Sequence, residues 1–345
     1  MPRQLITMKK TLLIILTIFF QITSFAAIVS NDLVLMFWNL ENLFDWHDSE
    51  VNVADKEFSS RGSRHWTRSR FQTKINLIAK AILWTADNQA HLPDIIGFAE
   101  VENFGVLRRL VKDTALARLD YGIVHYDSDD PRGIDCALLY RKDRFRILSS
   151  GYVRPQTLRT RDILYVTLQE MDPANPQIYN VIVNHHPSKF SGAATSDKSR
   201  IEVMKLMCHL ADSLSKRTDY YDVEQEVLPV IAMGDFNDNP DGESFKHVFG
   251  LRNEGLDLFE RGDGTIRFGG KWDLIDLFFT KGLEAGTSEK GIETKMTIVK
   301  IPFLRIEDRQ YGGEKPFRTY VGKTWTGGVS DHCPILLTIR NFVGM

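Results

Sequence analysis

The sequence has few cysteines, little excess charge of either sign and no internal repeat. Cys136, Cys208 and Cys333 are too few and too scattered for a disulfide framework or a cysteine-based zinc site. The formal net charge of −2 excludes a generic polyanion binder, so any contact with nucleic acid must come from a local basic patch. An apolar fraction of 43% without a short sequence period excludes a disordered chain and a coiled-coil rod. The composition is that of a globular chain with a sizeable core.

The first 26 residues predict an export signal. Met8-Lys9-Lys10 precede the apolar run Thr11–Phe20, which is followed by Ser24-Phe25-Ala26. A charged start, a short apolar stretch and a small-x-small cleavage site have the layout of a secretory signal peptide. The alternative is an N-terminal membrane anchor, but the run is short for a span of about 20 residues. We therefore expect a signal peptide over residues 1–26 and one exported domain, periplasmic or secreted, over residues 27–345.

Apolar runs bounded by polar and turn residues predict a chain rich in strands with few helices. The predicted strands are Leu33–Trp38, Asp94–Ala99, Ile123–Tyr126, Cys136–Arg141, Phe145–Leu148, Ile163–Leu168, Ile178–Val183, Val230–Met233, Leu274–Phe279 and Pro334–Ile339. Helices are predicted after a Thr67 cap, over Phe104–Lys112 and after a Ser196 cap. Some strands follow one another directly and others are separated by helices. This pattern favours mixed sheets with outer helices over a doubly wound fold or an alternating barrel.

Polar side chains follow these apolar strands at the points where the strands end. The motifs are Asn39 in WNLEN, Glu100 in GFAEVE, Asp135 in RGIDC, His185-His186 in VNHHP, Asp235-Phe236-Asn237, Asp276 and Ser330-Asp331-His332. Carboxylate and amide oxygens suit a hard cation such as Mg²⁺, Mn²⁺ or Ca²⁺. Histidines beside such a cation move protons or stabilise charge. The combination points to metal-assisted hydrolysis of a phosphate ester.

The order of these motifs along nearly the whole chain resembles the endonuclease/exonuclease/phosphatase superfamily, which includes deoxyribonuclease I. The resemblance implies an α/β fold, a four-layer sandwich of two mixed β-sheets flanked by helices, with the site at one edge. It also implies a divalent cation, Mg²⁺ or in its place Mn²⁺ or Ca²⁺. Asn39 and Glu100 would hold the cation with Asp331 beside it. Asp235 and Asn237 would position the attacking water and the scissile phosphate, with Asp235 a candidate general base.

The resemblance also implies roles for two catalytic histidines. His332 would contact a non-bridging phosphate oxygen and would be oriented by Asp276. His185 would protonate the leaving group or stabilise its charge, and Asp135 is the carboxylate expected to orient it. Because neighbouring residues of a strand face opposite sides, only one of His185 and His186 can face the site. The family pattern selects His185 and leaves His186 as a rim or structural residue.

The substrate class is predicted from the basic residues. The segment Arg61–Arg70, extended by Lys74, carries a concentrated positive charge with Trp66 available to stack on a base. We expect Arg64 and Arg68 to contact substrate phosphates. The alternative is a solvated loop whose arginines pair with nearby acids, Asp55 and Glu57 among them.

The sequence thus predicts an exported nuclease that hydrolyses DNA or RNA phosphodiesters. The alternative is a phosphatase or phosphodiesterase acting on a lipid headgroup or a small phosphate ester. A non-catalytic binding domain of the same fold is a third reading. Lys189, two residues after the VNHHP motif, is a candidate substrate contact. No obligate protein partner is indicated.

Overall fold

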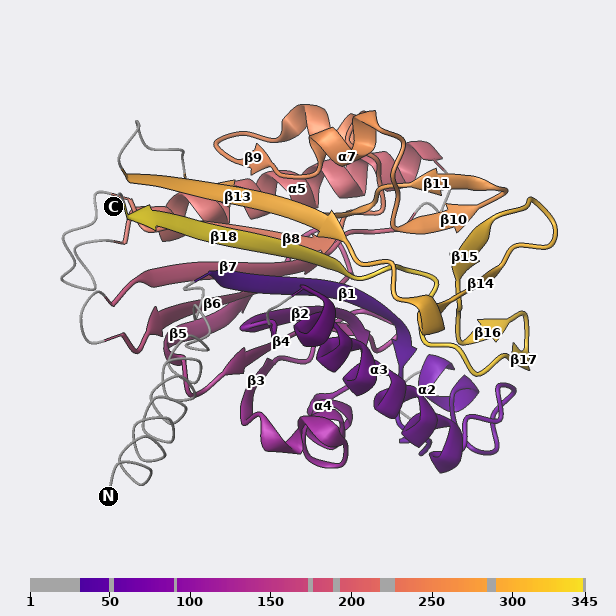
Figure 1. Cartoon of the computed structure of the whole chain (residues 1–345). Helices are drawn as coiled ribbons and strands as arrows, with labels where there is room; N and C mark the ends of the chain where they lie inside the picture. The colour runs from indigo at the N-terminus through magenta and orange to yellow at the C-terminus, as the bar shows by residue number, and fades with distance from the viewer. Residues whose placement is uncertain are drawn as a thin grey trace, which may run out of the picture. The chain divides into compact units, whose positions relative to one another are not determined.

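Two mixed sheets of six strands each form the framework of the protein (Figure 1). The first sheet has the order β13 (Lys290–Ile298), β18 (Ile335–Val343), β1 (Leu33–Leu43), β2 (Ile95–Val101), β4 (Asp135–Arg141), β3 (Tyr121–His125). The second has the order β5 (Phe145–Val153), β6 (Ile163–Glu170), β7 (Ile178–His185), β8 (Val230–Asp235), β12 (Asp276–Lys281), β9 (Arg252–Asn253). In each sheet one central pair, β1–β2 or β7–β8, is parallel and its neighbours are antiparallel.

The computed structural model describes residues 32–49, 53–89, 92–172, 176–188, 193–217, 227–283 and 290–343. The predicted signal peptide and Lys189 lie outside the described residues. Within them, none of the helices combines the length and the apolar character that a membrane crossing requires.

The two sheets pack face to face because β1 and its neighbours alternate apolar side chains between two cores. Leu33, Leu35 and Phe37 pack in the core that includes the second sheet, whereas Met36 and Trp38 pack under the outer helices. The sheets approach closely at Gly97 of β2, where a Cβ atom would lie 2.7 Å from the Met233 sulfur of β8. This alternation decides which side chains of the first sheet face the second one.

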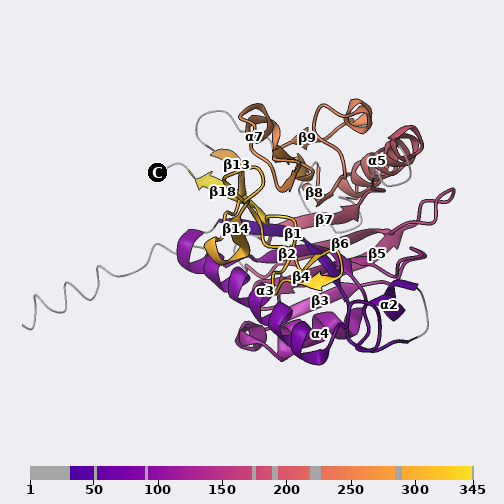
Figure 2. The ribbon, with the colours of Figure 1, turned by 90° about the vertical axis from the view of Figure 1, so that its right-hand side faces the viewer.

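Helices cover the outer faces of the sheets and complete four layers (Figure 2). α3 (Arg68–Gln89) and α4 (Phe104–Lys112) lie on the first sheet, and α5 (Ala193–Ser215) lies on the second. The short helices α2 (Val53–Glu57) and α7 (Leu256–Glu260) lie in connections. This confirms the predicted four-layer sandwich of two mixed sheets flanked by helices.

The structure extends or adds elements at several places. α5 begins at Ala193, so Ser196 lies inside that helix rather than at its cap. β13 was not predicted, because the sequence KGIETKMTI has few apolar residues for an edge strand. Three two-stranded hairpins lie outside the two large sheets: β10 (Ile266–Phe268) with β11 (Lys271–Asp273), β14 (Arg305–Glu307) with β15 (Glu314–Pro316), and β16 (Tyr320–Val321) with β17 (Thr324–Trp325). Figure 1 shows these hairpins gathered at one end of the strands.

Candidate active site

Three side chains stand in one row across the second sheet. His185 at the end of β7 is in register with Asp235 at the end of β8, and Asp235 is in register with Asp276 at the start of β12. Because side chains in register on neighbouring strands share a face, the three point the same way. His185 Nε2 lies 3.5 Å from Asp235 Oδ2. All three residues are buried.

His332 reaches this row from the loop before β18. Its Nδ1 lies 2.8 Å from Asp276 Oδ2, and its Nε2 lies 3.8 Å from Asp235 Oδ2. The loop is fixed to the first sheet, because Ser330 Oγ donates to the carbonyl oxygen of Asn39 at 2.6 Å and accepts from the His332 N–H at 3.0 Å. His332 is therefore held between carboxylates by contacts to both sheets.

The first sheet contributes Asn39 and Glu100. Asn39 has the same parity in β1 as Leu35 and Phe37, so it faces the second sheet, where its Nδ2 donates to Asp235 Oδ2 at 3.0 Å. Glu100 reaches the same place through a bulge in β2, where its backbone adopts the left-handed region with φ 62°. A carboxylate in such a sparsely populated conformation is typical of a functional position.

Asn39 links the two sheets in its present orientation. Its Nδ2 also lies 3.4 Å from Glu100 Oε1, and its Oδ1 accepts from the Glu41 N–H at 2.9 Å. The amide nitrogen thus faces the carboxylates, and ligation of a cation by Asn39 requires the amide group to turn.

A charge network that sequence reasoning missed lies behind these carboxylates. Glu41 accepts hydrogen bonds from Arg318 Nε at 3.0 Å and from the Thr319 N–H at 2.7 Å. Arg318 also donates to Asp331 Oδ2 at 3.0 Å. Lys74 Nζ donates to the Glu41 carbonyl oxygen at 2.7 Å and to Thr319 Oγ1 at 2.8 Å. The network ties the β1 bulge, α3 and the Asp331 loop together.

A signal for one member of this network is present in the sequence. Lys74 stands three residues after Phe71 and four before Ile78, so it occupies the apolar face of its helix. A lysine at such a position is buried and needs a partner. Glu41 and Arg318 carry no comparable signal. Glu41 follows a bulge, with φ 46° at Glu41 and 59° at Asn42, which breaks the strand alternation.

Burial and neighbouring charges separate the pKa values of the site residues. Burial raises the pKa of Asp235 to about 7, with Asp276 adding to the shift and His332 opposing it. Burial lowers the pKa of His185 well below its usual value, and the positive charge of Arg161 lowers it further. The pKa of His332 is raised well above its usual value; burial opposes the shift, but the carboxylates of Asp276 and Asp235 outweigh it. One histidine is thus neutral and the other cationic at neutral pH.

The donor set fits a divalent cation. Glu100 and Asp331 supply hard carboxylate oxygens, and burial together with Asp331 raises the pKa of the adjacent Glu41 to about 7. Carboxylate oxygens of Asp235 and Asp276 lie within 4.8 Å of each other, beside the His332 ring. Carboxylates that crowd each other in a buried place are stabilised by a nearby cation.

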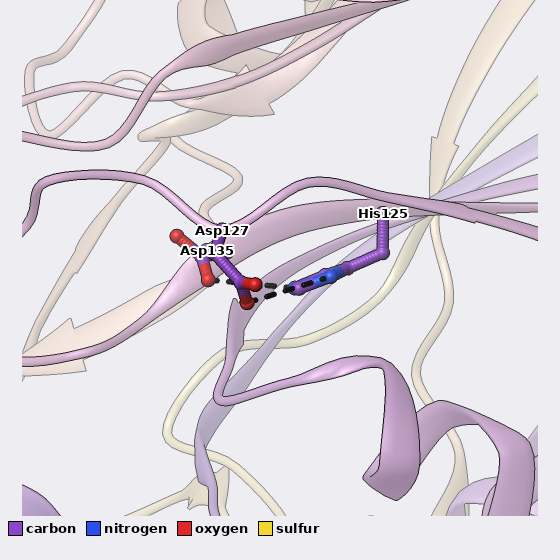
Figure 3. Close-up of side chains that lie close together, drawn as sticks. All are labelled: His125, Asp127 and Asp135. Carbon is purple, nitrogen blue, oxygen red and sulfur yellow. Dashed lines mark ion pairs between the residues drawn. The ribbon is translucent and has the colours of Figure 1, made fainter. Parts of the chain in front are cut away.

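The predicted pairing of Asp135 with His185 is wrong in the structure. Asp135 has the parity of Ala137 and Leu139, which pack under the outer helices, so it lies on the opposite face of the first sheet from the site. Its Oδ2 lies 3.4 Å from His125 Nε2, and Asp127 lies at the same end of the His125 ring (Figure 3). In the described part of the chain, His185 Nδ1 has no hydrogen-bond partner.

His186 and Asn237 complete the description of the predicted residues. His186 is fully buried against Phe236, with ring centroids 4.8 Å apart, so it is a core residue and not a rim residue. Asn237 adopts a left-handed backbone with φ 51°. Its N–H donates to Asp235 Oδ1 at 2.9 Å, and its Nδ2 donates to the His186 carbonyl oxygen at 3.0 Å. Asn237 therefore fixes the Asp235 carboxylate.

The basic segment is largely occupied by contacts within the chain. Trp66 is fully buried and donates to the Phe44 carbonyl oxygen at 2.8 Å, so it is not available to stack on a base. Arg64 Nε pairs with Glu57 at 2.7 Å, and its guanidinium lies 5.1 Å from the Tyr320 ring centroid. The alternative prediction, pairing with Glu57, thus holds for Arg64. Arg68 is exposed, with its guanidinium 5.7 Å from the Trp46 ring centroid.

The protein is a four-layer α/β sandwich with carboxylates and two histidines at one sheet edge. This combination of fold and site defines a class of enzyme, the metal-dependent hydrolases of phosphate esters. The endonuclease/exonuclease/phosphatase family model matches residues 34–341. The chain belongs to this family, whose members are hydrolases that use divalent metal ions.

Solved structures with the same fold cover nearly the whole chain. A humanized TDP2 from D. rerio has 16% identity and a TM-score of 0.55, covering 90% of this chain and 100% of that one. The human Nocturnin catalytic domain with bound sulfate has 16% identity and a TM-score of 0.54, covering 91% and 96%. A mannosyl-6-phosphatase from Bacteroides thetaiotaomicron has 17% identity and a TM-score of 0.53, covering 89% and 99%. No curated protein matches the chain. At these identities the similarity shows the fold alone.

Proposed function

We propose that the chain hydrolyses a phosphate ester by in-line attack of water, with a divalent cation held at Glu100 and Asp331 and, once its amide has turned, Asn39. The observation that carries the proposal is the row of His185, Asp235 and Asp276 in register, closed by His332. A bound cation would supply charge stabilisation to the phosphate.

The side chains of the row divide the chemistry among them. Asp235, whose pKa is raised to about 7, accepts the proton of the attacking water at Oδ2, and Asn237 holds that carboxylate in place. His332, kept protonated by Asp276, donates to a non-bridging phosphate oxygen. His185 stabilises the charge that develops on the leaving oxygen. These side chains are in place before charge develops on the phosphate and on the leaving oxygen. Such preorganised electrostatic stabilisation is the main source of catalysis in phosphoryl transfer.

The substrate class is supported by fewer observations than the reaction type. The matched structures include a D. rerio TDP2 complexed with a single-strand DNA product and a mannosyl-6-phosphatase, so the fold accommodates both nucleic acids and small esters. The engagement of Arg64 and Trp66 within the chain removes the main support for a phosphate-tracking surface. We therefore favour a small phosphate ester or a short nucleotide as substrate, and long DNA or RNA is the competing class. Export of the enzyme remains a proposal from the sequence.

The test uses the purified chain from residue 27 with Mg²⁺ against bis(p-nitrophenyl) phosphate, plasmid DNA, RNA, sphingomyelin and inositol phosphates. We expect hydrolysis of at least one substrate and a loss of at least a hundredfold in Asp235→Asn. Asp143→Asn, an exposed acid paired with Arg141 at 2.6 Å, is the matched control and should retain activity. A folded wild-type protein that hydrolyses none of these substrates would overturn the proposal.

A further inference from the structure

A cationic cavity of about 550 Å³ lies beside the end of β7, next to the catalytic row. Its lining includes Arg132, Arg159, Thr160 and Arg161 from the two loops that precede β4 and β6, together with Ser188. Among the described residues of the lining, Asp130 is the one that is acidic. Three arginines against one aspartate give this cavity a positive potential.

Two polar groups in the lining are buried without a partner. Thr160 and Arg161 are 5% and 4% exposed. In the part of the chain that the structure describes, neither Thr160 Oγ1 nor Arg161 Nε has a hydrogen-bond partner. An unpaired buried polar group costs free energy, so two such groups in one place indicate that a ligand pairs with them. Both groups belong to residues of a cationic wall, and such a wall suits an anion.

Arg161 is fixed by its remaining donors. Its Nη1 donates to Asp130 Oδ2 at 3.1 Å, and its Nη2 donates to the carbonyl oxygen of His186. The guanidinium is therefore oriented before any ligand arrives, which lowers the entropic cost of binding. Arg132, 43% exposed, pairs with the same Asp130 at 3.3 Å.

Arg159 supplies the exposed charge of the cavity. Its side chain is exposed and lines both this cavity and a neighbouring one of about 620 Å³. Among the described residues it has no ion pair or hydrogen bond, in contrast to Arg132 and Arg161. The neighbouring cavity is lined by Glu102, Asp127, Asp129, Asp130 and Asp135 and so repels an anion. An anionic group that Arg159 binds is thereby directed into the smaller, cationic cavity.

The cavity lies within reach of the reacting phosphate. Ser188 in its lining is three residues from His185, and an extended chain spans at most about 11 Å over three residues. Arg161 is bonded to the backbone of His186, the next residue after His185. The positive charges of Arg161 and Arg132 also lower the pKa of the His185 imidazole. One small substrate can therefore occupy both places.

We propose that this cavity binds a second anionic group of the substrate, a phosphate or a carboxylate, next to the phosphate ester that is hydrolysed. The proposal rests on the proposed function and narrows the substrate class to phosphate esters that carry a second anionic group. A short nucleotide with a terminal phosphate and a sugar or inositol bisphosphate share this chemistry.

The experiment compares paired substrates that differ by one phosphate. One pair is the dinucleotide dTpdT with and without a 5′-phosphate, and the other is an inositol bisphosphate against its monophosphate. In the class that is hydrolysed, we expect the added phosphate to lower KM about tenfold. Arg159→Gln should remove this advantage and leave kcat for the member that lacks the added phosphate unchanged. Arg146→Gln, an exposed arginine bonded to Gln169, is the matched control.

Equal KM values within both pairs, or an advantage that survives in Arg159→Gln, would overturn the proposal. Calorimetric titration with inorganic pyrophosphate, in the absence of divalent metal, separates this outcome from failure of the proposed function. Binding that weakens about tenfold in Arg159→Gln and in Thr160→Val supports the cavity even if no ester is hydrolysed. Binding that is equal in wild type and both variants counts against it.

Discussion

Replacement of Asp276 by asparagine tests the electrostatic role of the Asp276–His332 pair. With an effective dielectric constant of about 20, unit charges 2.8 Å apart attract each other by about 6 kcal/mol. The raised pKa of His332 depends on this attraction and on Asp235, because burial alone lowers it. Asp276→Asn keeps the side-chain shape, removes the charge and should leave His332 neutral at pH 7.

The assay is the pH dependence of kcat on bis(p-nitrophenyl) phosphate. A histidine with a raised pKa stays protonated above its usual range, so activity that needs its proton is lost only as the pH rises through the raised value. In Asp276→Asn this alkaline limb should move to lower pH, and kcat at pH 7 should fall by about a hundredfold or more. The titration of His332 followed by NMR should show the same shift. An Asp276→Asn profile parallel to that of the wild type would refute the electrostatic argument.

Three further outcomes are expected. Exhaustive chelation should abolish activity and Mg²⁺ should restore it, because the donor set consists of oxygen ligands; full activity in chelator would exclude a metal role. His185→Ala should lower kcat at least a hundredfold, while His186→Leu, at a fully buried site, should leave it within about threefold; the reverse result exchanges the two assignments. Arg64→Ala should lower the free energy of unfolding by about 1 kcal/mol with KM on nucleic acid unchanged, and a higher KM would restore Arg64 as a substrate contact.

Strand alternation accounts for the parts of the fold that could be predicted. The apolar runs identify the central strands, and the parity of Asn39 with Leu35 and Phe37 places it on the face toward the second sheet. The same rule, applied to β4, places Asp135 on the outer face, since Ala137 and Leu139 pack there. The expected Asp135–His185 pair is wrong because the family pattern that predicts it carries no information on this parity.

Contacts between distant segments account for what could not be predicted. Glu100 would face the outer helices if β2 were regular, and only the bulge turns it inward. The partners of Glu41 are Arg318 and Thr319, which lie more than 270 positions away in a loop without a strand pattern. Arg161 is held in position by hydrogen bonds to Asp130 and to the backbone of His186. None of these contacts can be predicted from the local preference of the sequence for helix, strand or turn.

The left-handed backbone at Glu41, Asn42, Glu100 and Asn237 has a consequence for attempts to engineer this enzyme. Non-glycine residues in that conformation each cost about 1 kcal/mol or more, and glycine relieves the cost. A screen that selects only for heat resistance will therefore favour glycine at these four positions. At Glu41, Glu100 and Asn237 the gain deletes a side chain that shapes the reacting edge, so thermal tolerance and turnover are opposed at these residues. Stabilised variants must be sought elsewhere, for example at the exposed Phe268 and Val321 of the hairpins.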